Sequence, residues 1–159
     1  MHPYEAELLA FDLGLRHKTM CCAESCTGGL IGAAMTDMAG SSEFFLGSAV
    51  TYSNEAKMKL LGVREQTLAD HGAVSEETAS EMALGAAAMF GADYSVAVTG
   101  IAGPGGETPT KPVGLVYIAV SDGSRVVVTK NNFEGGRQQV RDSTVMEACG
   151  LLKDFIEGI

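Results

Sequence analysis

The sequence predicts a single three-layer α/β/α domain over residues 1–159, with a mixed, largely parallel β-sheet. Runs typical of buried strands alternate along the chain with segments of helical periodicity, which is the pattern of α/β domains. Glycine-rich turns separate these segments, and 46% of the residues are hydrophobic, as a core requires. No internal repeat, linker or low-complexity segment divides the chain.

The N-terminal part of the chain contains two predicted strands and two predicted helices. Residues 4–16 place leucines and a phenylalanine on a broad face, which predicts a helix. Residues 18–24 form a short apolar run that ends in a charge, as a buried strand does. The turn 25–29 is glycine-rich, and the segment from there to Gly40 is helical. Residues 46–53 are rich in Val, Thr and Tyr and predict the second strand.

The middle of the chain is predicted to be helical. Asn54 is the expected N-cap of a helix over 55–62, which ends at a glycine. Residues 63–72 predict a short helix or turn. Ser75 is the expected cap of a long helix that ends at Gly91.

The C-terminal part contains three predicted strands and one helix. Strands are expected at 92–100 and 113–121, joined by a long glycine-rich loop. Asp122-Gly123 is a hairpin signal, so residues 124–133 predict an antiparallel partner strand. Residues 134–159 predict the last helix. Its inward side is expected to hold Val140, Val145, Cys149, Leu152 and Ile156.

The composition excludes several functional classes. The 11 basic and 20 acidic residues give a net charge of −9, which argues against a nucleic-acid-binding surface. No apolar run approaches the roughly 20 residues of a membrane span, and the acidic N-terminal segment is unlike a signal peptide. We therefore expect a cytoplasmic protein with no membrane or nucleic-acid partner.

The spacing of cysteines and histidines predicts no metal site. The four cysteines include no CxxC pair, and the three histidines form no HxxxH or HExxH pattern. We interpret the cysteines as reduced thiols of the core. We expect neither a metal nor another cofactor.

Candidate functional residues follow the predicted strands, at the edge where α/β sheets bind ligands. Ser25 comes directly after the first strand and before a helix that opens with Thr27, Gly28 and Gly29. Free N–H groups at such a helix start bind a phosphate or a developing oxyanion. The alternative is that Ser25 or Thr27 is only the N-cap of this helix.

Lys57 lies on the first turn of the helix that follows the second strand. The helix dipole opposes a cation there, which would lower the pKa of Lys57. A neutral lysine serves as a base toward a serine hydroxyl where no histidine is available. The alternative is a solvated Lys57 paired with Glu55 or Glu43.

Two further segments are candidates for ligand binding. The loop 100–112 follows the third strand, and loops of this length are often functional. Arg137 and Arg141 are four residues apart and share a helix face that suits a phosphate. The alternatives are a surface connection for the loop and a surface pair offset by Glu134 and Asp142 for the arginines.

With these candidates in place, the chain resembles the CinA C-terminal-domain family, in its stand-alone form, over residues 4 to 157. Members of this family include the nicotinamide-nucleotide amidohydrolases. The segments that carry the resemblance occur in order, and they are AESCTGG (23–29), VTYSNEAK (50–57), LGV (61–63), HGAVSEETA (71–79), AVTGIAGPGG (97–106), KPVGLVYIAV (111–120) and FEGGRQQVR (133–141).

The resemblance implies hydrolysis of nicotinamide mononucleotide (NMN) to nicotinate mononucleotide and ammonia, without a metal. Ser25 would attack the carboxamide carbon, and Lys57 would take the Ser25 proton and later help to protonate ammonia. Tyr52 would orient Lys57 or relay the proton, and Thr99 would line the amide or oxyanion site. The other residues implied to bind the substrate are Thr27, Gly28, Gly29, Gly100 and Gly103, with Arg137 and Arg141 for the 5′-phosphate.

The sequence departs from the family pattern at two positions. Gly136 stands where the family commonly has an acidic residue before the arginine, and Ser48 stands where it commonly has a second glycine. The first departure removes a carboxylate that would cap the helix or orient the arginine. The resemblance also implies a homo-oligomer, a dimer or larger. A non-catalytic mononucleotide-binding module of the same fold is the alternative function.

Overall fold

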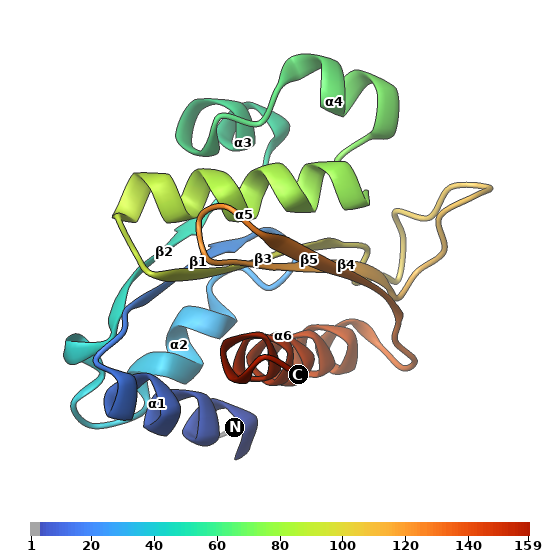
Figure 1. Cartoon of the computed structure of the whole chain (residues 1–159). Helices are drawn as coiled ribbons and strands as arrows, with labels where there is room; N and C mark the ends of the chain where they lie inside the picture. The colour runs from blue at the N-terminus through green and yellow to red at the C-terminus, as the bar shows by residue number, and fades with distance from the viewer. Residues whose placement is uncertain (1–3) are drawn as a thin grey trace.

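The computed structural model describes residues 4–159, which fold around one five-stranded sheet (Figure 1). The strands are β1 (Met20–Glu24), β2 (Phe45–Val50), β3 (Tyr94–Gly100), β4 (Leu115–Ser121) and β5 (Val126–Asn132). Their order across the sheet is β2-β1-β3-β4-β5. β1 is parallel to β2 and β3, whereas β4 is antiparallel to β3 and to β5. Four strands therefore run in one direction and β4 runs in the other.

Helices cover both faces of the sheet, so the domain has three layers. The helices are α1 (Tyr4–Arg16), α2 (Leu30–Thr36), α3 (Asn54–Leu61), α4 (Glu65–His71), α5 (Glu76–Phe90) and α6 (Arg137–Glu157). α1, α2 and α6 lie on one face, and α5 lies on the other (Figure 1). α3 and α4 pack against α5 on its side away from the sheet (Figure 1).

The two cores follow from the alternation of side chains along the strands. In β1, Met20 and Cys22 join the core beneath α1, α2 and α6, whereas Cys21 and Ala23 join the core beneath α5. All five residues of β1 are buried, as expected for a central strand covered on both faces. The core beneath α5 is rich in alanine, which brings this helix close to the sheet.

A glycine in α5 allows α3 to lie directly against it. A Cβ atom added at Gly85 would collide with the carbonyl oxygen of Leu61, the last residue of α3. Any larger residue at position 85 would therefore push α3 outward. Since α3 carries Lys57, this contact helps to set the position of that side chain.

The structure confirms the predicted fold class and most of the predicted elements. Ser75 caps α5 by accepting a hydrogen bond from the Thr78 N–H, and α3 and α5 end at the left-handed glycines Gly62 and Gly91. The predicted inward residues of the last helix are buried. Residues 65–71 form the helix α4, which resolves the choice between helix and turn. The first three residues of the predicted domain lie outside the described residues.

Two predictions about the elements need correction. The N-cap of α3 is Ser53, whose hydroxyl accepts from the Ala56 N–H, and Asn54 is already inside the helix. The sheet contains a second antiparallel pairing, β3 with β4, in addition to the predicted hairpin of β4 and β5. The long loop between β3 and β4 contains no crossover helix, so the chain returns beside β3 in the opposite direction.

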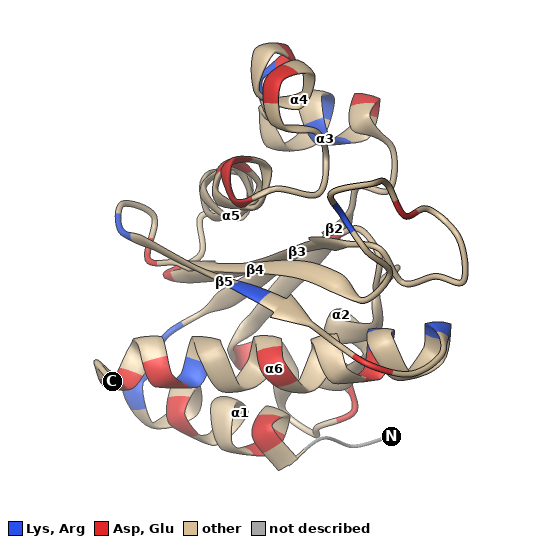
Figure 2. Cartoon of the chain, turned by 90° about the vertical axis from the view of Figure 1, so that its right-hand side faces the viewer, with Lys and Arg blue, Asp and Glu red and all other residues tan. Residues whose placement is uncertain are grey.

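Charged residues lie mainly on the outer helices and loops, and the sheet is nearly free of them (Figure 2). Within residues 4–159, Glu24 and Lys57 are the only charged residues that are buried. Burying a charge is unfavourable unless it is paired or hydrogen-bonded, so these two positions direct attention to one end of the sheet. Within the same residues, no helix has both the length and the apolar character needed to cross a membrane.

Candidate active site

The site lies at the carboxyl ends of the parallel strands β1, β2 and β3. Ser25 follows β1 directly, and its backbone N–H donates to the Val98 carbonyl in β3 (3.1 Å). On the other side, the Thr51 N–H donates to the Glu24 carbonyl (2.8 Å), which fixes the end of β2 beside β1. These bonds hold the two segments that carry the catalytic candidates.

Lys57 contacts Ser25 directly. Its Nζ lies 3.0 Å from Ser25 Oγ, and it donates to the Thr51 carbonyl at 2.8 Å and the Tyr52 carbonyl at 3.3 Å. The Lys57 residue is 1% exposed. Burial lowers the pKa of Lys57 below its ordinary value of 10.5, because it disfavours the charged form.

The solvated alternative for Lys57 is therefore wrong. Glu55 forms its ion pair with Lys59 instead (2.8 Å), and Lys57 faces inward toward β1. The predicted direction of the pKa shift is confirmed, but its main cause is burial and not the helix dipole.

Glu24 organises the turn that carries Ser25, and the sequence reasoning did not find it. Its buried carboxylate accepts from Thr27 Oγ1 (2.7 Å), from the N–H groups of Ile31 and Gly32 (2.8 and 3.1 Å), and from Ser48 Oγ (2.6 Å). The available signal was a carboxylate placed just before a helix that opens on glycines without a capping side chain.

The structure tests both hypotheses about this turn, the N-cap and the free N–H groups. The N-cap residue of α2 is Gly29, so the hypothesis that Ser25 or Thr27 serves as the cap is wrong. The expectation of free N–H groups is only partly correct, because Ile31 and Gly32 donate to Glu24. Among the described residues, no acceptor is found for the N–H groups of Thr27 and Gly29.

Tyr52 and Arg137 lie on the rim of the site. Tyr52 is 63% exposed, and its hydroxyl accepts from Arg137 Nη2 at 3.4 Å. Arg137 Nη1 donates to the Gly103 carbonyl in the long loop (2.8 Å). Tyr52 thus contacts Lys57 through its backbone carbonyl and Arg137 through its side chain.

Arg141 is bonded to the turn after Ser25. Its Nε donates to the Cys26 carbonyl (3.2 Å) and its Nη2 donates to the Thr27 carbonyl (3.1 Å). The alternative of a surface pair offset by Glu134 and Asp142 does not hold for Asp142, whose carboxylate accepts from Gln138. The structure places Arg137 at the loop after β3 and Arg141 at the turn that carries Ser25.

Thr99 and Gly100 form the end of β3 beside this site. The Thr99 hydroxyl is buried and donates to the Ala73 carbonyl (2.8 Å), just before α5. Gly100 lies so close to β4 that an added Cβ would stand 2.6 Å from Val116 Cγ2. Both residues pack tightly against neighbouring segments.

The two departures from the family pattern have clear structural consequences. The Ser48 hydroxyl donates to Glu24, so it adds a hydrogen bond to the carboxylate that holds the turn. Gly136 is the N-cap residue of α6, and its N–H donates to Oε1 of Gln139 (2.6 Å). Gln139 thus satisfies a backbone group at the start of the helix that carries both arginines.

The described residues contain no group of three or more His, Cys, Asp or Glu side chains that could hold a metal ion. The four cysteines are free and buried, and burial raises the pKa of the Cys26 thiol to about 11. Cys26 is therefore protonated and unreactive at neutral pH, although it adjoins Ser25.

Comparison with known proteins identifies relatives along the whole domain. The chain is 56% identical over 136 residues to a CinA-like protein of Endomicrobium trichonymphae, covering 86% of this chain and 32% of that protein. It is 50% identical over 149 residues to a CinA-like protein of Citrifermentans bemidjiense, covering 94% of this chain and 35% of that protein. The chain thus spans about a third of the length of these two relatives.

Solved structures match over nearly their full length. The competence/damage inducible protein CihA from Agrobacterium tumefaciens is 43% identical, with a TM-score of 0.91 and 96% of each chain covered. A CinA superfamily protein from Klebsiella pneumoniae is 34% identical, with a TM-score of 0.93 and coverage of 98% of this chain and 99% of that one. The sequence profile of the CinA C-terminal domain matches residues 5–156. The chain belongs to the CinA C-terminal-domain family.

Proposed function

We propose that this protein hydrolyses the carboxamide of nicotinamide mononucleotide, giving nicotinate mononucleotide and ammonia, with Ser25 as the nucleophile. The observation that carries the proposal is the 3.0 Å contact between Lys57 Nζ and Ser25 Oγ at the carboxyl end of the sheet. A buried lysine beside a serine hydroxyl is a base and nucleophile pair that needs no histidine.

The surroundings of Lys57 suit a neutral amine. A neutral amine has two N–H donors and one lone pair, and the Thr51 and Tyr52 carbonyls are the acceptors for the two N–H groups. The lone pair is then left for the hydroxyl proton of Ser25. Because burial lowers the pKa of Lys57, the neutral form becomes accessible at lower pH than for a solvated lysine.

The reaction then proceeds in two stages. Lys57 takes the hydroxyl proton as Ser25 Oγ bonds to the carboxamide carbon. The C–N bond breaks and the proton on Lys57 passes to the departing nitrogen, which leaves as ammonia. A water molecule next gives a proton to Lys57 and its oxygen attacks the acyl carbon. The C–Oγ bond breaks, and Lys57 returns the proton to Ser25.

The proposed substrate contacts surround this pair. The unpaired N–H groups of Thr27 and Gly29 are candidates to stabilise the oxyanion. Arg137 is exposed on the rim and is our first candidate for the 5′-phosphate. The further residues proposed to line the substrate site are Gly28, Thr99, Gly100 and Gly103.

The test is to incubate the purified protein with NMN, without added metal, and to measure ammonia and nicotinate mononucleotide. We expect turnover by the wild type and its loss in Ser25→Ala, with unchanged circular dichroism. Full activity in Ser25→Ala would exclude the mechanism. Saturable NMN binding without product would instead identify a non-catalytic mononucleotide-binding module.

A further inference from the structure

Arg141 is held by the protein itself more completely than Arg137. Three of its side-chain N–H groups have acceptors, which are the Cys26 carbonyl, the Thr27 carbonyl and Oε1 of Gln138 (3.3 Å). Arg141 is half-buried, whereas Arg137 is exposed. A guanidinium has five N–H donors, so most of those on Arg141 are already used.

The carbonyls that Arg141 reaches require a donor. Cys26 and Thr27 are both buried, and a buried carbonyl without a partner costs about as much as a lost hydrogen bond. The turn leaves the end of β1 and does not continue a strand or helix through these residues. The Leu30 N–H already donates to the Thr27 carbonyl (3.2 Å), and Arg141 adds a second donor there, whereas for the Cys26 carbonyl Arg141 is the only donor found among the described residues.

Glu24 and Arg141 hold the same turn through opposite kinds of group. Glu24 accepts from the Thr27 hydroxyl and from N–H groups at the start of α2, and Arg141 donates to the carbonyls of residues 26 and 27. Ser25 lies between Glu24 and Cys26 in the sequence. The position of its Oγ relative to Lys57 therefore depends on both contacts.

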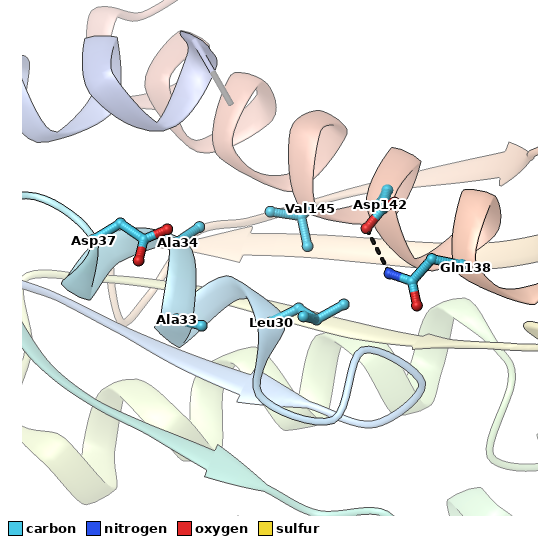
Figure 3. A pocket seen from close by; sticks show the side chains of 7 residues that line it. All are labelled: Leu30, Ala33, Ala34, Asp37, Gln138, Asp142 and Val145. Atoms are coloured by element: carbon cyan, nitrogen blue, oxygen red, sulfur yellow. Dashed lines mark hydrogen bonds between the residues drawn. The ribbon is translucent and has the colours of Figure 1, made fainter. Parts of the chain in front are cut away.

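A hydrogen-bonded pair behind Arg141 fixes its orientation. Gln138 accepts from Arg141 through Oε1 and donates through Nε2 to Asp142 Oδ1 (2.8 Å), as Figure 3 shows for the second bond. Both residues line a pocket of about 360 Å³ between α2 and α6, with Leu30 and Val145 also on its wall. This chain of bonds runs from the surface of α6 to the turn that carries the nucleophile.

We infer that Arg141 is a positioning residue for Ser25 and does not bind the substrate phosphate. This inference rests on the proposed amide hydrolysis. It gives the two arginines different roles. Arg137 contacts the loop after β3 and the exposed Tyr52, where it can reach an anion. Arg141 donates to the backbone carbonyls of the two residues that follow Ser25.

The kinetic test compares Arg141→Gln and Arg141→Lys with Arg137→Gln, using NMN and its dephosphorylated nucleoside as substrates. We expect Arg141→Gln to lower kcat about 100-fold for both substrates, since a displacement of about 1 Å costs this much. KM for NMN should change little, and Arg141→Lys should recover part of the rate through one remaining carbonyl contact. Arg137→Gln should instead remove the preference for NMN over the nucleoside.

The opposite pattern would overturn the inference. If Arg141→Gln raised KM for NMN without changing kcat, and left the nucleoside reaction unaffected, Arg141 would be a phosphate ligand. Hydrogen exchange provides a measurement that needs no turnover. The hydrogen-bonded amides of this turn, Gly28 and Leu30, should exchange about tenfold or more faster in Arg141→Gln than in the wild type or Arg137→Gln. Unchanged exchange would contradict a positioning role, even if the wild type released no ammonia from NMN.

Discussion

The proposed chemistry of the site depends on the burial of a single lysine. Among the described residues Lys57 has no carboxylate partner, and it bonds to a hydroxyl and two carbonyls. None of these neutral groups compensates a full positive charge, so burial shifts the pKa of Lys57 downward. The same residue beside a carboxylate would have its pKa raised and would be a poor base.

This arrangement predicts a pH-dependent rate. Lys57 must be neutral to accept the Ser25 proton, so kcat/KM should fall as the pH decreases through the pKa of Lys57, which lies below 10.5. Lys57→Met should lower kcat by about 10²- to 10⁴-fold and remove this ionisation. The measurement is the rate of ammonia release between pH 5 and pH 10, with KM determined at each pH. A flat profile for the wild type would contradict the role of Lys57.

Glu24 makes a prediction about stability at the same scale. Glu24→Ala removes the acceptor for two backbone N–H groups and two hydroxyls, so the free energy of unfolding should fall by about 3 kcal/mol. Ser48→Gly removes only one of these bonds and should cost about 1 kcal/mol. Urea denaturation of both variants measures the difference. Equal losses would contradict a contribution to stability from the three hydrogen bonds to Glu24 that Ser48→Gly retains.

At the scale of elements, the contact between α3 and α5 determines where Lys57 stands. Gly85 lies in α5 against the carbonyl of Leu61, and Leu61 is in the same helix as Lys57. The usual effect of replacing a helical glycine by alanine is a gain of about 1 kcal/mol. Here the added methyl group meets backbone, which cannot move aside as a side chain does.

Gly85→Ala should therefore destabilise the protein and also reduce kcat, because α3 must shift away from β1. Gly14→Ala in α1 is the matched control, since among the described residues no heavy atom beyond the neighbouring backbone of α1 stands within 4 Å of the added Cβ. It should raise the free energy of unfolding by up to about 1 kcal/mol and leave kcat unchanged. Thermal unfolding and the ammonia assay test both variants. A stabilised, fully active Gly85→Ala protein would be inconsistent with the packing described.

At the scale of the whole molecule, one outer surface is unusually apolar. Tyr4, Phe11 and Leu15 lie along one stripe of α1, and each is about two-thirds exposed. A groove of about 450 Å³ beside Phe11 and Leu15 is also lined by Phe44. Contiguous apolar surfaces of this kind are typical of protein interfaces.

We therefore predict a homo-oligomer in solution, with this stripe of α1 in the contact. Phe11→Glu should weaken the association, because it places a charge in the centre of the stripe. Sedimentation velocity at several concentrations measures the mass of both proteins. A monomeric wild type at all concentrations would contradict the prediction, and an unchanged oligomer in Phe11→Glu would move the contact elsewhere.

Local sequence signals predicted the elements of this protein well. Glycine stops, the Ser75 cap, the apolar alternation and the hairpin turn depend on neighbouring residues, so they can be recognised without the fold. The predicted N-cap of α3 was wrong by one residue. Ser53 and Asn54 are both residue types that cap helices, and spacing alone does not distinguish them. The β3–β4 pairing depends on how a long loop returns, which no local pattern encodes.

The sequence by itself determined the fold class, and it brought Ser25 and Lys57 forward as candidates because each follows a strand. Only the tertiary structure decided that Lys57 is buried against Ser25, that Glu24 replaces a helix cap, and that the two arginines have different partners. The physical reason is that burial and long-range hydrogen bonds arise where β1, α3 and α6 meet. Residues 25, 57 and 141 are far apart in the chain, and only the packed sheet and helices bring them together.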